Sequence, residues 1–417
     1  MREMKDSGIE WVGKIPNDWA IKPLYCFFSE RKNKNILGKE DNLLSLSYGK
    51  VIRKDINTNE GLLPSNYNGY NIVEAGDIVI RPTDLQNDQR SLRTGLVTER
   101  GIITSAYIAL KPLSNINSRF YHYLLHTYDT LKVFYNMGGG VRQGLSYDEF
   151  AKLKIYSPSS SEQQRIADFL DRECGKIDSI IADVEKQIEL LKKYKRSVIF
   201  EAVTKGLEPS VQMKDSGIKW IGNIPCNWNV DKIKYHLRRN EKRNTGNQQV
   251  LSVYREYGVI PKDSRDDNHN VTSEDVSKYK YVRPGSLVIN KMKAWQGSLA
   301  VSDYEGIVSP AYFIFEFMGH AFINKYLHYL LRGAYKDEFR RISGGIREGQ
   351  WDLSPDEFMN TLVTIPPVKE QEKIISYIDK KCAEIDGVIA DKKEQLDVLE
   401  NYKKSVIYEY VTGKKEA

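Results

Sequence analysis

A stretch of 43 residues that occurs twice constrains this chain more than any other feature. Residues 162–204 and 370–412 align without a gap at an offset of 208, and 20 of the 43 positions are identical. In each copy, apolar residues follow one another at alternating spacings of four and three, the pattern of a coiled-coil seam. We therefore predict two long helices, each roughly 65 Å long at about 1.5 Å per residue.

The seam pattern predicts how these helices pair. We expect the partner of each copy to be the other copy, in an antiparallel coiled coil; two amphipathic helices packed on separate domains are the alternative. Lysine stands at the seam positions Lys195, Lys392 and Lys403, where a polar residue fixes register at a cost in stability. The apolar seam residues are Leu170, Cys174, Ile177, Ile181, Val184, Ile188, Leu191, Ile378, Cys382, Ile385, Ile389, Leu396 and Leu399.

A second repeat divides the rest of the chain. Residues 4–19 return as residues 213–228 with 11 of 16 positions identical, including the tryptophans that end each copy. Glycine and proline predict a loop, which the tryptophans can anchor on a neighbouring surface. Two interpretations are open: the loop fixes how each globular segment leaves its helix, or it docks another protein.

Together the repeats predict a mixed α/β protein with a pseudo-twofold internal duplication. Two similar globular domains would be joined by the two long helices. Matching segments predict the shared plan, namely a turn that leads into a short apolar strand at 73–80 and 282–289, a strand at 101–108 and 306–313, and a helix at 120–125 and 326–331. The predicted parts are an N-terminal segment with the first domain (1–161), a central helix (162–205), a linker with the second domain (206–369) and a distal helix (370–417).

The two globular segments diverge where polar residues gather. Gly76 to Gly101 is 25 steps and Gly285 to Gly306 is 21, and the residues between do not align. A glycine-rich loop with one arginine also follows each predicted helix. Arginine, lysine, asparagine and glutamine hydrogen-bond base edges and phosphates, so these segments predict DNA contacts, although solvated loop positions are the alternative. The candidates are Arg81, Gln86, Arg90, Arg93, Arg142, Gln143, Asn290, Lys291, Lys293, Trp295, Gln296, Arg347 and Gln350.

Charge is distributed unevenly along the chain. The net charge is +6, but the two helical copies together hold −4, while residues 20–161 hold +5 and residues 229–369 hold +4. The basic surplus therefore lies on the globular segments, which mildly favours a polyanionic partner.

Several function classes lack their characteristic residues. The four cysteines include no CxxC pair, so neither a disulfide framework nor a zinc site is indicated. His122 and His126 lie one helical turn apart, but the repeat offers His328 and Arg332, so we expect packing and no metal. No nucleotide-binding loop, methyltransferase tetrapeptide or GxSxG is present. Without an apolar run of about 18 residues, we expect a cytoplasmic, non-catalytic protein that does not bind membranes.

The two repeats carry a family resemblance. The motif Met-Lys-Asp-Ser-Gly-Ile-x-Trp-[Val/Ile]-Gly-x-Ile-Pro-x-x-Trp heads each half, and a Glu-Gln-x-[Arg/Lys]-Ile helix closes each half. With these motifs in this order, the whole chain resembles the specificity subunit of type I restriction-modification systems.

The resemblance implies a division of labour. Each target-recognition domain would read one half of a split, asymmetric sequence in double-stranded DNA, and the paired helices would set the spacer. The helices would also help hold two methyltransferase subunits, which bind S-adenosylmethionine and methylate adenine. Separate restriction subunits would translocate and cut DNA with ATP and Mg, so no cofactor is expected in this chain.

Two other function classes stay open at this point. A duplicated coiled-coil scaffold would bind proteins or other ligands through the same domains. A nuclease with an unrecognised site would cleave DNA by itself in the presence of metal.

Overall fold

The structure is a computed structural model that describes most of the chain. The described residues are 2–57, 66–83, 85, 91–113, 116–135, 137, 144–243, 246, 248–255, 257–264, 272, 275–345 and 351–417.

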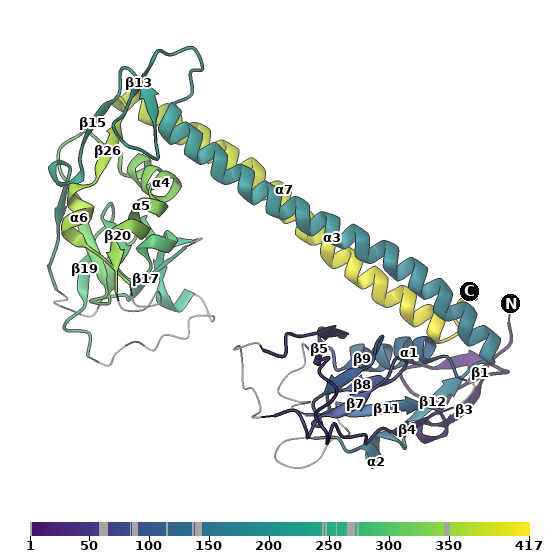
Figure 1. Cartoon of the computed structure of the whole chain (residues 1–417). Coiled ribbons are helices and arrows are strands. Elements are labelled where there is room, and N and C mark those ends of the chain that lie inside the picture. The colour runs from purple at the N-terminus through teal and green to yellow at the C-terminus, as the bar shows by residue number, and fades with distance from the viewer. Residues whose placement is uncertain are drawn as a thin grey trace. The chain divides into compact units, whose positions relative to one another are not determined.

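Two compact units make up the chain (Figure 1). Unit 1 consists of Met1–Glu185 and Lys393–Ala417, and unit 2 consists of Lys186–Lys392. The long helices α3 (Ser160–Lys205) and α7 (Val368–Val411) contribute one segment each to both units. The two predicted long helices are therefore present. Both ends of α3 and the start of α7 lie within two residues of the expected positions, whereas α7 ends at Val411 and not at residue 417. Each unit combines globular structure with a pair of helix segments.

Unit 1 is built around a four-stranded antiparallel sheet of order β4-β11-β8-β9. The sheet centre is apolar and β-branched, since the Ile78–Ile80 strand is buried throughout. Helix α1 begins where the Asn117 side chain accepts hydrogen bonds from two helix amides, and it buries Phe120 and Leu124 in the same core. The strands are β1 (Met4–Asp6), β2 (Lys14–Pro16), β3 (Ala20–Pro23), β4 (Phe28–Glu30), β5 (Leu44–Ser47), β6 (Lys50–Arg53), β7 (Asn71–Val73), β8 (Ile78–Ile80), β9 (Thr94–Leu96), β10 (Gly101–Ile103), β11 (Ile108–Pro112) and β12 (Lys154–Ser157); the helices are η1 (Leu24–Cys26), α1 (Ser118–Thr130) and α2 (Tyr147–Phe150).

Unit 2 repeats this sheet with the order β16-β23-β20-β21. The smaller pairings recur as well, because β15 pairs with β26 as β3 pairs with β12, and β19 pairs with β22 as β7 pairs with β10. Helix α4 takes the place of α1. The strands are β13 (Met213–Asp215), β14 (Asn223–Pro225), β15 (Asn229–Lys232), β16 (Leu237–Arg239), β17 (Leu251–Tyr254), β18 (Gly258–Pro261), β19 (Lys280–Val282), β20 (Leu287–Asn290), β21 (Leu299–Val301), β22 (Gly306–Val308), β23 (Tyr312–Phe317), β24 (Ser343–Gly344), β25 (Asp352–Leu353) and β26 (Leu362–Ile365); the helices are η2 (Ile233–Tyr235), η3 (Lys262–Ser264), η4 (Ala294–Gln296), α4 (Asn324–Ala334), α5 (Lys336–Arg341) and α6 (Pro355–Asn360).

Two local predictions are wrong. The expected single strands 101–108 and 306–313 are each two strands that pair in different sheets, because a turn interrupts them. The Tyr107 amide donates to the Thr104 carbonyl at 3.1 Å, and the Tyr312 amide donates to the Ser309 carbonyl at 3.1 Å. The repeated loop at 4–19 and 213–228 also contains strand pairs, β1 with β2 and β13 with β14.

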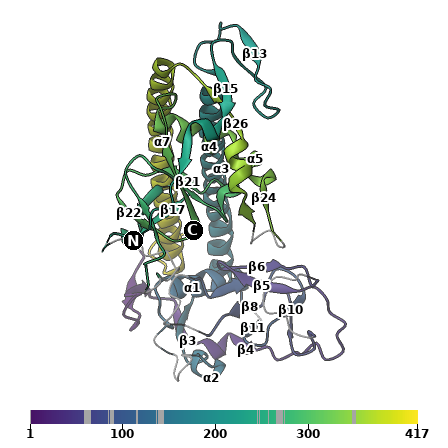
Figure 2. The same ribbon diagram turned by 90° about the vertical axis from the view of Figure 1, so that its left-hand side faces the viewer.

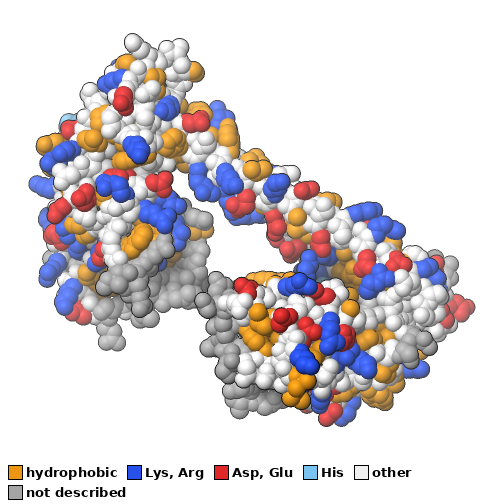
Figure 3. Space-filling model, viewed as in Figure 1, with side chains coloured by type: hydrophobic (Ala, Val, Ile, Leu, Met, Phe, Trp, Pro, Cys, Tyr) orange, Lys and Arg blue, Asp and Glu red, His pale blue; other side chains and the backbone are white. Residues whose placement is uncertain are grey.

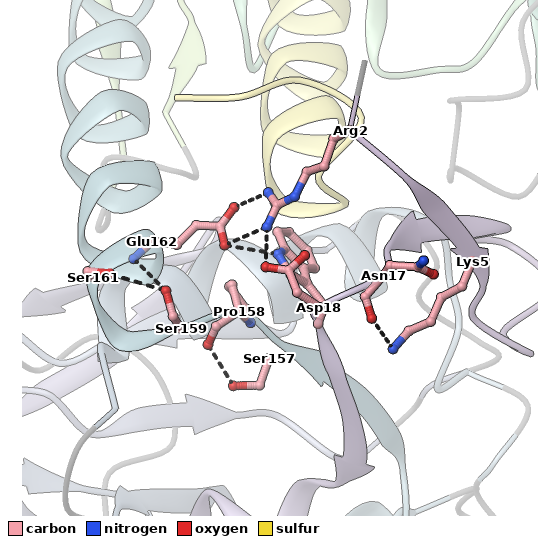
Figure 4. Close-up of polar contacts among 10 residues, drawn as sticks. Arg2, Lys5, Asn17, Asp18, Ser157, Pro158, Ser159, Ser161 and Glu162 are labelled. Atoms are coloured by element: carbon pink, nitrogen blue, oxygen red, sulfur yellow. Dashed lines mark hydrogen bonds and ion pairs between the residues drawn. The ribbon is translucent and has the colours of Figure 1, made fainter.

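The start of each long helix is held by the loop motif of its own unit. In unit 1 the Trp19 indole Nε1 donates to Glu162 Oε2 at 3.1 Å, and Arg2 also bonds this carboxylate (Figure 4). In unit 2 the Trp228 indole Nε1 donates to Glu370 Oε1 at 2.9 Å. Both tryptophans are fully buried. The anchoring interpretation of the loop therefore describes what these tryptophans do.

The glutamine that follows each glutamate ties the helix to its surroundings. Gln163 accepts from the Asn117 amide at 2.9 Å and donates to the Pro158 carbonyl at 3.0 Å. Gln371 accepts from the Ile323 amide at 2.8 Å and donates to the carbonyls of Pro366 at 2.9 Å and Ala321 at 2.7 Å. The Glu-Gln pair thus joins three segments of each unit at one point.

Within each unit the segments of α3 and α7 run antiparallel. In unit 1 the Phe169 and Tyr410 rings stack at 4.1 Å, and Lys403 pairs with Asp178. In unit 2 Lys195 Nζ lies 2.6 Å from Asp386 Oδ2, and Val203 shares a core with Ile378.

We predict that Gln371→Ala destabilises unit 2 by about 2–4 kcal/mol, because it removes three hydrogen bonds and leaves buried partners unsatisfied. Urea unfolding is the measurement. The matched control is Gln395→Ala on the exposed side of the same helix, which should change the unfolding free energy by less than about 0.5 kcal/mol. Equal effects of both substitutions would show that the clamp does not stabilise the unit.

Candidate nucleic-acid interface

Basic side chains are interspersed with acidic ones on the globular parts. Figure 3 shows Lys and Arg side chains in blue among red Asp and Glu side chains over the visible face. The net charge of +5 on residues 20–161 and +4 on residues 229–369 is therefore a mild positive surplus, and acidic side chains share the same surface. Such a surplus attracts phosphates while leaving sequence discrimination to individual side chains.

In unit 1 the structure describes two of the four candidates between Gly76 and Gly101. The half-buried Arg81 follows β8, and its amide donates to the Arg93 carbonyl at 2.8 Å. Arg93 is fully buried: its Nη1 donates to the Thr83 carbonyl at 2.6 Å, and its guanidinium lies 5.7 Å from the centre of the Tyr135 ring. Arg93 therefore supports this segment and does not present its charge at the surface. Gln86 and Arg90 lie outside the described residues.

A buried carboxylate that sequence reasoning missed anchors the same segment. Asp129, at the end of α1, accepts from the Arg93 amide, from the Thr94 amide at 3.1 Å and from the Tyr135 hydroxyl at 3.1 Å. Burial raises the pKa of Asp129. The sequence signal for this anchor is an aspartate just beyond the predicted helix 120–125, in line with its apolar residues, where a charged residue is retained only with partners.

In unit 2 the candidates form a compact turn between β20 and β21. The Asn290 side chain accepts from the Met292 amide at 3.1 Å, and the turn closes through η4 and Gly297 at φ +86°. Lys291 Nζ lies 2.9 Å from Asp352 Oδ2, whereas Lys293 is exposed.

Two tryptophans and an arginine gather at this turn. The ring centres of Trp295 and Trp351 are 5.8 Å apart, and the Arg340 guanidinium lies 5.7 Å from one and 5.9 Å from the other. The indole Nε1 of Trp295 and Oε1 of Gln296 are buried without a hydrogen-bond partner. Such atoms retain unused hydrogen-bonding capacity. Trp351 and Arg340 were not among the predicted DNA contacts.

The candidates of the glycine-rich loops, Arg142, Gln143, Arg347 and Gln350, lie outside the described residues.

The seam residues are all turned away from solvent to some degree. Leu170, Cys174, Ile177, Val184, Ile188, Ile378, Ile385 and Ile389 are buried, and Ile181, Leu191, Cys382, Leu396 and Leu399 are half-buried.

Other apolar residues of the long helices are exposed, and they recur at the repeat offset. Unit 1 exposes Ile180 (45%), Val398 (62%) and Tyr402 (58%). The equivalent residues of unit 2 are Val388 (44%), Leu190 (54%) and Tyr194 (55%). Each unit therefore presents the same three exposed apolar positions outside the seam. Exposed apolar residues that recur at equivalent positions are candidates for an interaction site.

The described residues hold no group of three or more His, Cys, Asp or Glu side chains arranged for a metal. Over the same residues no helix is long and apolar enough to span a membrane.

The histidines of α1 and α4 are held in the neutral form. Burial lowers the pKa of His122 to about 3, of His126 to about 4 and of His328 to about 3. Nearby cations add to this effect, namely Lys403 beside the α1 pair and Arg332 beside His328.

Comparison with known proteins gives one consistent family. A family model described as "Type I restriction modification DNA specificity domain" matches residues 16–190. The chain is 23% identical over 438 residues to the type I restriction enzyme MjaVIII specificity subunit of Methanocaldococcus jannaschii, covering 96% of this chain and 94% of that protein. A second specificity subunit from this organism, provisionally assigned to the enzyme MjaX, is 22% identical and covers 97% of this chain and 95% of that protein.

The fold has a solved counterpart. A chain from a study of complex assembly and conformational transition of the type I R-M system superimposes with a TM-score of 0.67 at 12% identity, covering 96% of this chain and 99% of that chain. The predicted mixed α/β fold with long helices is thus a known one.

We predict that acid destabilises unit 1 partly through its histidines. Their folded-state pKa values lie below the ordinary value of 6.5, so the unfolded chain binds more protons and stability falls as pH drops from about 6.5 to 4. Between pH 7 and pH 5, His122→Phe should lose roughly 1 kcal/mol less unfolding free energy than the unmodified chain does. This figure is discounted for the partial exposure of the side chain. Unfolding at both pH values is the measurement, and His320→Phe, at an exposed histidine, is the control. An unchanged pH dependence in His122→Phe would contradict this role.

Proposed function

We propose, from the premise that this chain belongs to the family of type I restriction-modification specificity subunits, that it recognises a two-part asymmetric DNA sequence, one half with each unit. The observation that carries the proposal is a shared scaffold with unlike polar segments. Both units have the same sheet order and the same tryptophan-glutamate anchor. The segments between β8 and β9 and between β20 and β21 differ in length and sequence. Equal scaffolds with different side chains toward DNA favour two sites of one kind with different specificities.

We further propose that α3 and α7 form an antiparallel coiled coil related by a pseudo-twofold axis, which sets the spacer between the half-sites. Reciprocal ion pairs support this arrangement, since Lys403 meets Asp178 and the equivalent Lys195 meets Asp386. A rigid helix pair holds two recognition units at constant separation, because helical rise is fixed at about 1.5 Å per residue.

The equivalent exposed apolar sets of the two units support docking of two copies of one partner. Ile180, Val398 and Tyr402 would form one site, and Val388, Leu190 and Tyr194 the other. We propose the adenine methyltransferase subunit as this partner. S-adenosylmethionine would bind to that subunit, and ATP and Mg to the restriction subunits, while this chain supplies recognition without catalysis.

The test is the methylation map of plasmid DNA from cells that express this chain with its methyltransferase subunit, with the methyltransferase alone as control. We expect a new adenine mark at a two-part motif with a constant spacer, absent from the control. A soluble complex that leaves no mark would overturn the proposal.

The alternative function is an interaction scaffold without DNA recognition. Salt dependence separates the two, because binding through several phosphates weakens steeply as salt rises. The basic surplus on both globular segments favours DNA.

We predict that Tyr194→Glu and Tyr402→Glu each remove one of two bound methyltransferase subunits, and that the double variant binds none. A buried carboxylate without a partner would cost several kcal/mol at such an interface. Mass measurement of the purified complex counts the subunits. Because both tyrosines are exposed, the variants should unfold like the unmodified chain. Full assembly of the double variant would exclude this surface as the docking site.

A further inference from the structure

Each unit carries a β-hairpin with a tyrosine and a glycine at its turn. In unit 1, β5 and β6 are joined by the two residues Tyr48 and Gly49, since Ser47 pairs with Lys50. In unit 2, Tyr254 at the end of β17 pairs with Gly258 at the start of β18, and Tyr257 precedes Gly258. Both hairpins are labelled in Figure 2 through β5, β6 and β17. Sequence comparison of the units did not single out this pair, because the turns differ in length.

Both tyrosines are exposed. Tyr48 is 88% exposed and Tyr257 is 56% exposed. Tyr48 also has φ +47°, a left-handed conformation that glycine, asparagine and aspartate adopt readily and an aromatic residue rarely does. With 88% of its surface exposed, Tyr48 contributes little to packing, and residues held in such sparsely populated conformations concentrate at binding sites. Tyr257 keeps one side of its ring near Tyr254, with ring centres 6.5 Å apart.

The hairpins pack against the strand that follows each candidate recognition segment. A Cβ on Gly49 would lie 3.0 Å from Leu92 Cδ1, next to the end of the segment that begins at Arg81. A Cβ on Gly258 would lie 3.3 Å from the Ala300 Cβ in β21, and Ser298 Oγ donates to the Val253 carbonyl at 3.3 Å. Each tyrosine therefore lies near the segment in which its unit differs from the other.

A basic side chain accompanies each tyrosine. Lys50 follows Tyr48 by two residues and has a side chain 72% exposed, with the Asp178 carboxylate 3.8 Å from its Nζ. Arg255 precedes Tyr257 by two residues and is exposed. An exposed aromatic ring beside a cation matches the surface of duplex DNA, where deoxyribose and base edges lie between phosphates. A two-stranded ribbon also fits the major groove.

We propose that Tyr48 and Tyr257 are equivalent DNA-contacting residues, one at each half-site, which insert a hairpin turn into a groove beside the recognition segment. This inference rests on the proposed function, which does not itself assign a role to either tyrosine.

The experiment compares DNA affinity of full-length variants. The probe is a fluorescent random-sequence duplex, which requires no knowledge of the target. Tyr48→Ala and Tyr257→Ala should each raise Kd about tenfold, the effect of losing one aromatic contact, and the double variant should lose more. Because tyrosine is neutral, the slope of log Kd against log salt should stay constant, whereas Lys50→Ala should lower it by about 0.9.

Two exposed tyrosines outside the hairpins serve as controls. Tyr25 is 54% exposed in η1, and Tyr235 is 60% exposed in η2. Alanine at either position should leave Kd unchanged.

A glycine variant separates binding from folding. Tyr48→Gly removes the aromatic ring and the left-handed strain together, so its melting temperature should not fall while its Kd rises. Unchanged Kd in the double alanine variant would overturn the inference and leave the proposed function intact. Failure of the unmodified chain to bind any duplex would overturn both.

Discussion

The hydrogen bonds at the start of each long helix are the constraint on which the rest of each unit depends. The first turn of a helix has amides without intrahelical partners and attracts negative charge. Glu162 and Glu370 occupy this turn and accept the indole proton of a fully buried tryptophan. Hydrogen bonds to charged groups contribute about 1.5–3 kcal/mol each. The adjoining glutamine then fixes the start of α1 or α4, so helix, loop motif and sheet domain meet at one buried point.

Further hydrogen bonds tie the helix of each globular part to its long helix. Asp171 accepts from the Tyr123 hydroxyl at 2.9 Å, and Asp379 accepts from the Tyr329 hydroxyl. These bonds hold α1 and α4 along the long helices. In unit 1 the end of α1 then supports the segment after β8 through Asp129. In unit 2 His328, within α4, accepts a hydrogen bond from the Val301 amide in β21 at 3.2 Å. Side chains that read DNA must be held within a fraction of an ångström, which loops alone do not provide.

The sequence predicted the parts of this arrangement better than their contacts. A seam of apolar residues over 43 positions is typical of a long helix, so both long helices were predicted, although α7 ends at Val411 and not at residue 417. Both members of the Trp19–Glu162 bond lay in motifs that the repeats singled out, yet 143 residues separate them and no local pattern joins them. The strands 101–108 and 306–313 were merged because a turn built from a threonine or serine and a tyrosine resembles strand sequence. Arg93 was predicted to contact DNA because arginine is common both at DNA contacts and as an internal support of loops. Only the burial of its side chain distinguishes the two roles.

Trp351, Asp129 and Tyr48 were not predicted for a different reason. Each lies on an element other than the diverging segment, and only the fold brings it near that segment. A recognition site assembled from several elements leaves no continuous sequence signature, whereas a helix does.

Lys195 and Lys403 favour an antiparallel direction more than they add stability. Lys195 and Asp386 have side chains 30% and 56% exposed, and ion pairs at such positions contribute about 0–1 kcal/mol. In an antiparallel pair, each lysine meets the aspartate of the other copy. In a parallel, in-register pair the equivalent positions would face each other, so Lys195 would meet Lys403 and Asp178 would meet Asp386. Two helices of similar sequence could also pair in a parallel arrangement. Like charges at facing positions repel each other, so the lysines and aspartates disfavour that arrangement. A duplicated helix can thus specify an antiparallel partner through two charges at unequal positions.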